Sequence, residues 1–230
     1  MGTRHLICVF YKGKFVVAQY GQYDGYPEGQ GVAIVRFLRK PANVQELKRG
    51  LKYTYTVSEL SAEKAKMRID ALQGLKLLAW RYFVKYRDEL LTVQIMDYLE
   101  PSLHPVTGAA ILEVVAQARA WRKVPIRFEL EFANDQFSCE YTYVIDLDKD
   151  VLEVFGQVGD DKTPGHRFAG VGEDDDPVPS YISSFEFSEL QKSNGEQDFL
   201  DHLDRIENAR SERDLDDFTD SSESAAEYAM

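Results

Sequence analysis

Cysteine and long apolar runs are both scarce in this chain of 230 residues. The two cysteines, Cys8 and Cys139, are too few for a disulfide framework, so we expect a reducing, cytoplasmic location. No apolar run approaches the roughly 20 residues that a membrane-spanning helix needs, so we expect no membrane partner. Residues 1–10 lack a long apolar segment that ends at a small-residue cleavage site, and we therefore expect no secretory signal.

Residue patterns that bind metals are missing as well. The four histidines and two cysteines follow no zinc-binding spacing. Asp146, Asp148 and Asp150 resemble the start of a calcium-binding loop. Such a loop needs glycine and glutamate where this chain has Val151 and Gln157. We predict neither a metal nor a cofactor, and we interpret this acidic segment as the turn of a β-hairpin.

Acidic residues are concentrated in the last part of the chain. The formal net charge is −12, and residues 171–230 hold 18 of the 39 acidic side chains but only four of the 27 basic ones. An acidic segment repels phosphate backbones, so we expect no nucleic-acid partner. We interpret residues 191–230 as an acidic, largely disordered tail, with an autoinhibitory or partner-docking segment as the alternative.

Apolar patterning predicts a single α+β domain over residues 3–190. Residues 4–11 and 15–20, rich in β-branched and aromatic side chains, flank a short turn and predict a β-hairpin. Helical spacing predicts the next elements. They are a helix from Val32 to Leu38, a short helix capped by Asn43 and Glu46, a helix over residues 61–87 and a helix capped by Thr107. Residues 90–99 are apolar but fit a strand or a helix equally well.

Strand patterns return after this helical segment. Residues 126–132 alternate between apolar and charged side chains, which predicts a half-buried strand. Residues 137–147 and 151–155 predict two more strands, and residues 181–190 predict a last one. This order predicts an antiparallel sheet built from the N-terminal hairpin and the C-terminal strands, with the helical middle segment packed on it.

The glycine-rich loop at residues 21–31 is the candidate ligand site. It joins the predicted hairpin to the predicted helix, and loops on rigid scaffolds often carry function. The candidate ligand-binding residues are Tyr23, Asp24, Gly25, Tyr26, Glu28, Gly29, Gly31, Arg4 and His5. Two carboxylates disfavour a bare phosphate ligand, and they either cap the helix or hold a cation. The alternative interpretation is a turn that needs glycine for its backbone angles.

The N-terminal segment also raises the question of a nucleophile. N-terminal-nucleophile hydrolases begin their mature chain with threonine, serine or cysteine on a strand. In this sequence Thr3 follows Gly2, so a further cleavage would be needed. Cys8 lies inside an apolar run and is predicted to be a core residue. An inactive relative of this enzyme class therefore stays open as an alternative.

The sequence resembles a family of fungal proteins over roughly residues 3–187. The resemblance rests on the segments Thr3–Gly13, Gln19–Gly31, Glu129–Asp135 and Tyr143–Asp148. Shorter phage and bacterial proteins look similar in their Gly-Thr-Arg start and their Asp-Gly-Tyr-Pro loop. The resemblance implies a shared fold and an intracellular location, and it implies no reaction.

Two functional hypotheses follow from these patterns. The first is a binding or adaptor protein that uses the loop at residues 21–31 to bind a protein or small-molecule partner. The second is a hydrolase-like enzyme in which Asp24 and Glu28 act as acid and base or hold a metal. No catalytic constellation is recognisable, so we favour the binding protein.

Overall fold

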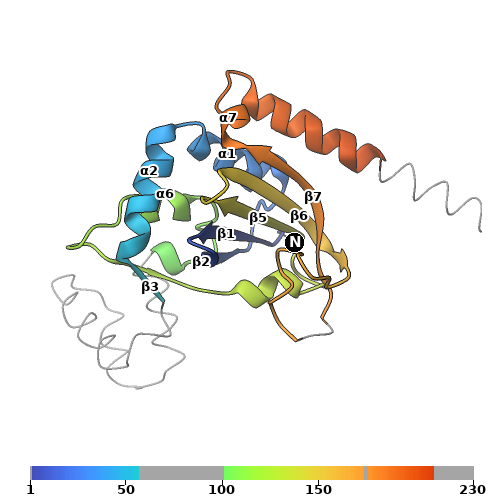
Figure 1. The fold of residues 1–230 in the computed structure, drawn as a ribbon, viewed down its shortest axis with the longest axis horizontal. Coiled ribbons are helices and arrows are strands. Elements are labelled where there is room, and N and C mark those ends of the chain that lie inside the picture. Colours follow the sequence, from blue (N-terminus) through green and yellow to red (C-terminus); the bar gives the residue numbers. More distant parts are fainter. Residues whose placement is uncertain (1, 57–100, 174–175, 210–230) are drawn as a thin grey trace, which may run out of the picture.

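The computed structural model describes residues 2–56, 101–173 and 176–209, which fold around a five-stranded sheet (Figure 1). The helix predicted over residues 61–87 and the apolar segment at residues 90–99 lie outside these described residues. None of the helices in the described part of the chain combines the length and apolar character that a membrane crossing requires.

The main sheet has the spatial strand order β2-β1-β5-β6-β7. Its strands are β1 (His5–Tyr11), β2 (Lys14–Gly21), β5 (Tyr141–Asp146), β6 (Val151–Asp160) and β7 (Val178–Glu186). Strand β1 pairs with β5 in parallel, and the other neighbouring strands are antiparallel. The predicted α+β fold is therefore confirmed, because the N-terminal hairpin and the C-terminal strands share one mostly antiparallel sheet.

Helices cover one face of this sheet (Figure 1). They are α1 (Val32–Leu38), α2 (Pro41–Gly50) and α6 (Ala110–Ala116), and the short helix α7 (Phe187–Leu190) follows the last strand. Strands β3 (Thr54–Thr56) and β4 (Val124–Ile126) form a separate two-stranded parallel sheet. Single helical turns lie at Leu51–Tyr53, Pro101–Leu103 and Leu130–Asn134.

The sheet separates two hydrophobic clusters, because successive side chains of a strand point to opposite faces. In β1, Ile7 and Val9 belong to the cluster that the helices cover. Leu6 and Cys8 belong to a smaller cluster that includes Phe168 from the segment after β6. The prediction that Cys8 is a core residue is confirmed.

The strand predicted over residues 126–132 is wrong beyond Ile126. The backbone N–H of Glu129 donates to the carbonyl of Ala18, and its carboxylate accepts from the N–H of Tyr20. This segment therefore lies along the edge of β2, and the chain then turns into the short helix at Leu130–Asn134. The apolar residues of segment 126–132 do not share one face of a strand. Ile126 joins the main core, whereas the ring of Phe132 packs on Tyr20.

Both predicted helix caps are wrong. Helix α2 begins at Pro41, whose fixed φ suits the first helical position. The side-chain amide of Asn43 instead donates to the carbonyl of Phe37 at 3.0 Å. Helix α6 begins at Ala110 with no side-chain cap, and the carbonyl of Thr107 accepts from the Ala110 N–H.

The tail predicted over residues 191–230 begins with a helix, at the place where the spacing of Phe199, Leu203 and Ile206 indicates a weak one. Residues 195–209 are helical, and Phe199 and Leu203 are buried in the main core. Arg36 of α1 also forms an exposed ion pair with Glu196 of this helix, with a Nη2–Oε1 distance of 2.6 Å. Buried apolar residues at positions four apart outweigh the acidic composition that predicted disorder. Residues 210–230 lie outside the described part of the chain.

Candidate functional site

The candidate loop follows the last residue of β2, Gly21, and leads directly into α1. Asp24 adopts a left-handed backbone conformation with a φ of 58°, which aspartate tolerates better than most residues. Residues Pro27–Gly31 form a π-helical turn that continues into α1. The segment predicted to be a loop over residues 21–31 is therefore helical in its second half.

Hydrogen bonds fix the shape of this loop from several sides. The N–H of Gly25 donates to the carbonyl of Thr3 at 3.1 Å, and the carbonyl of Gly25 accepts from the hydroxyl of Tyr143 at 2.8 Å. The Gln22 N–H donates to the carbonyl of Pro105 at 2.9 Å. The side chain of Gln30 accepts from the N–H of Ala109 at 2.7 Å. The loop is thus held to the residues before β1, to β5 and to the segment before α6.

His5 lies beneath the loop and is only 1% exposed. It stands opposite Gly21 in the register of the hairpin. A side chain at Gly21 would overlap the imidazole ring, and a Cβ at Gly25 would lie 2.9 Å from the His5 Cβ. Glycine is therefore needed at both positions because the imidazole occupies the space, which is a structural reason independent of any ligand.

Burial lowers the pKa of His5 to about 4, and the nearby Thr3 backbone and the charge of Asp24 oppose this shift in part. The imidazole is therefore neutral at physiological pH. Neither ring nitrogen makes a hydrogen bond of normal geometry to the described residues. The buried ring thus supports the loop by packing.

The pKa of His5 predicts a pH dependence of stability. Between pH 6.5 and about pH 4 the unfolded chain binds a proton on His5 that the folded chain excludes. The stability contribution is complete above pH 6.5 and is lost as the pH falls, which amounts to a loss of about 2 kcal/mol at about pH 4.5. Urea unfolding of the wild type and of His5→Leu at about pH 7 and pH 4.5 measures this loss. Equal pH dependence in the two proteins would contradict the assignment.

The polar side chains of the loop face solvent. Tyr23 is 47% exposed and Tyr26 is 49% exposed, and Asp24 and Glu28 are exposed as well. Neither carboxylate accepts a hydrogen bond from the described residues, so the predicted alternative that both cap a helix is wrong. Two aromatic rings and two acids are therefore exposed on one loop whose backbone is fixed.

The remaining candidates of the sequence prediction have structural partners. Arg4 donates from Nη1 to the hydroxyl of Ser138 at 3.0 Å, and its N–H donates to the carboxylate of Glu140 at 3.2 Å. A Cβ at Gly31 would lie 3.1 Å from the Phe199 ring, so Gly31 faces the core. Gly29 lies against the carbonyl of Asp24. The exposed group thus consists of Tyr23, Asp24, Tyr26 and Glu28.

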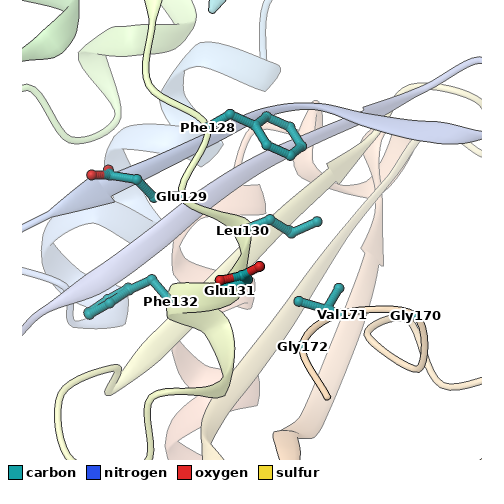
Figure 2. A pocket seen from close by; sticks show the side chains of 8 residues that line it. All are labelled: Phe128, Glu129, Leu130, Glu131, Phe132, Gly170, Val171 and Gly172. Atoms are coloured by element: carbon teal, nitrogen blue, oxygen red, sulfur yellow. The ribbon is translucent and has the colours of Figure 1, made fainter. Parts of the chain in front are cut away.

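Two pockets lie away from the loop, and the sequence pattern predicted neither of them. The first has a volume of about 520 Å³ and lies between residues 128–132 and residues 170–172. Figure 2 shows Leu130 and Glu131 on one side of this pocket and Val171 on the other. A second pocket, of about 470 Å³, lies over β6 and β7 beside residues 165–167. Both depend on how the segment after β6 folds back onto the sheet, which no local pattern encodes.

Histidine, cysteine and acidic residues do not gather into a metal-binding group within residues 2–56, 101–173 and 176–209. The acidic segment at Asp146–Asp150 forms the turn between β5 and β6, as predicted. Comparison of the chain with protein-family models, curated proteins and solved structures found no match. The functional argument therefore depends on the geometry of the site.

Proposed function

We propose that the protein is a binding module whose loop recognises a cationic segment, rich in lysine or arginine, of a protein partner. The observation that carries this proposal is the joint exposure of the Tyr23 and Tyr26 rings on a fixed loop. The exposed carboxylates of Asp24 and Glu28 lie on the same loop. Together these groups favour a ligand that is positively charged.

Aromatic rings and carboxylates attract cations by different physical effects. A tyrosine ring attracts an ammonium or guanidinium group to its face, by about 0.5–1 kcal/mol at an exposed site. A carboxylate adds a Coulomb attraction that salt screens. Because the hydrogen bonds of Gly25 and Gln30 already fix the loop, binding needs little further ordering.

The double variant Asp24→Asn/Glu28→Gln tests the electrostatic part of this proposal. Asparagine also tolerates the left-handed conformation that residue 24 adopts, so the loop keeps its shape. We expect the affinity for a short Gly/Arg/Lys peptide to fall about tenfold, and the salt dependence of binding to decrease. Isothermal titration calorimetry of the full chain at two salt concentrations measures both quantities.

Asp150→Asn is the matched control, because Asp150 also has a positive φ, of 53°, and an exposed carboxylate. This variant is expected to bind the peptide like the wild type. An uncharged Gly/Gln peptide of the same length should bind to neither protein. The proposal is rejected if the wild type does not bind the cationic peptide, or if the double variant Asp24→Asn/Glu28→Gln binds it as tightly as the wild type and the Asp150→Asn control do.

The same two carboxylates favour the alternative function, a hydrolase-like enzyme that uses Asp24 and Glu28 as acid and base. An inactive N-terminal-nucleophile relative is a form of this alternative, in which Thr3 is buried beside the loop and follows Gly2 in the sequence. The peptide experiment separates the two functions. Peptide cleavage that the double variant loses would favour the enzyme, whereas binding without cleavage favours the module.

A further inference from the structure

The second pocket lies on the face of the sheet that the helices leave uncovered. It is formed by strand residues of β6 and β7 and by the segment at residues 165–167, which crosses over them. Its volume of about 470 Å³ falls within the range of small-molecule sites, which is roughly 300–1,000 Å³. This pocket is separate from the loop at residues 21–31.

Aromatic rings line much of this pocket. The ring of Phe155 packs edge-on against His166, with centroids 5.9 Å apart, and against Tyr181, with centroids 5.6 Å apart. The Arg167 guanidinium lies 4.6 Å from the centroid of the Phe10 ring. Flat aromatic walls favour a planar ligand, which stacks on them or meets them edge-on.

His166 supplies a hydrogen-bond donor that has no acceptor. Its Nδ1 accepts from the N–H of Phe168 at 3.2 Å, so the neutral ring carries its proton on Nε2. This buried Nε2 has no hydrogen-bond partner among the described residues, and the nearest carboxylate oxygen, on Asp160, is 4.0 Å away. Buried donors are rarely left unpaired. A bound ligand can supply the acceptor that the Nε2–H of His166 lacks.

Lys149 is the cation of this pocket that has no carboxylate partner among the described residues. Lys149 and Arg167 both line it, together with the carboxylate of Glu153. Arg167 is shared by two carboxylates: it donates to Glu153 from Nε at 2.7 Å and from Nη2 at 2.5 Å, and to the buried Asp146 from Nη2 at 2.6 Å. Three neighbouring carboxylates have partners elsewhere, because Asp148 and Asp160 accept from backbone N–H groups and Asp150 pairs with Lys48.

We propose that this pocket binds a small planar aromatic carboxylate. The ring of the ligand packs on the aromatic side chains that line the pocket, and its carboxylate accepts from the Nε2–H of His166 and pairs with Lys149. This site does not depend on the cationic-segment function of the loop, and either proposal can fail alone.

Titration calorimetry of the full chain with indole-3-carboxylate tests the pocket. We expect saturable binding, which His166→Phe weakens by about tenfold or more, because the ligand carboxylate loses its hydrogen bond to Nε2. His104→Phe is the matched control, because His104 also accepts a backbone N–H, from Val106, through its Nδ1. The control is expected to bind like the wild type.

Two further comparisons keep the test decisive if His166→Phe does not fold. Lys149→Gln changes an exposed side chain and is expected to weaken binding about threefold or more. Cyclohexanecarboxylate has the same charge but no planar ring, and it should bind at least tenfold more weakly. No binding by the wild type, equal binding of both acids, or wild-type affinity in both pocket variants would overturn the proposal.

Discussion

Replacing Arg167 with methionine is expected to lower the free energy of unfolding by about 3–5 kcal/mol. The Arg167 Nη2 donates to Asp146 at 2.6 Å, and the Asp146 side chain is fully buried. Asp146 also accepts the N–H groups of Asp148 and Lys149, which shape the turn between β5 and β6. Without Arg167, a buried carboxylate loses its only cationic partner among the described residues. Urea unfolding of the wild type and variant measures the change.

Arg36→Met is the control for this prediction. Arg36 also forms a two-bond pair, from Nε and Nη2 to Glu196, but its side chain is 66% exposed. Exposed ion pairs stabilise proteins little, so this variant should unfold close to the wild type. Adding Asp146→Asn to Arg167→Met should restore part of the stability, because it removes the unpaired charge. Equal effects of Arg167→Met and Arg36→Met would contradict this account of the pair.

Gly29→Ala is expected to abolish most binding of the cationic peptide, with an affinity loss of about tenfold or more. A Cβ at this position would overlap the carbonyl oxygen of Asp24, which accepts from the Gln30 N–H. Because the clash is with backbone, the turn that presents Tyr23 and Tyr26 must open. We expect a stability loss of about 1–3 kcal/mol as well. Calorimetry with the same peptide measures the affinity.

Gly170→Ala is the control for Gly29→Ala, because it makes the same chemical change at a position where the added methyl group has space. A Cβ at Gly170 would meet no atom within 4 Å, and its φ is not positive. This variant should match the wild type in stability and peptide affinity. Wild-type affinity in Gly29→Ala would show that the shape of the loop is irrelevant to binding.

The sequence predicts the sheet better than its surroundings. The hairpin of β1 and β2 is encoded locally, by apolar runs on both sides of the turn at Lys12–Gly13, and the structure confirms it. The alternation at residues 126–132 also follows a strand pattern, but the structure has no strand over 127–132. Glu129 instead makes hydrogen bonds to Ala18 and Tyr20 at the edge of β2. Long-range contacts of this kind decide the conformation of short segments, and a local pattern does not contain them.

The candidate loop was predictable from the sequence, but its supporting contacts and the pockets were not, because they also depend on long-range contacts. Glycine and proline marked the loop, and its exposed residues Tyr23, Asp24, Tyr26 and Glu28 were among the predicted candidates. The packing of His5 against Gly21 depends on hairpin register and was not predicted. The pocket beside His166 depends on a segment folding back over β6, which spacing along the chain does not reveal. Residue types along the chain therefore indicate the loop at residues 21–31, whereas the pocket beside His166 becomes visible only in the folded structure.

The most direct test of the loop as a ligand site is an NMR titration of the ¹⁵N-labelled full chain with the Gly/Arg/Lys peptide. We predict that the largest amide shift changes occur at residues 22–29, and that Asp24→Asn/Glu28→Gln reduces them. Shift changes confined to the acidic helix at residues 195–209 would contradict the assignment, because they would place the peptide on another acidic surface. Shift changes absent from the whole chain would contradict it as well.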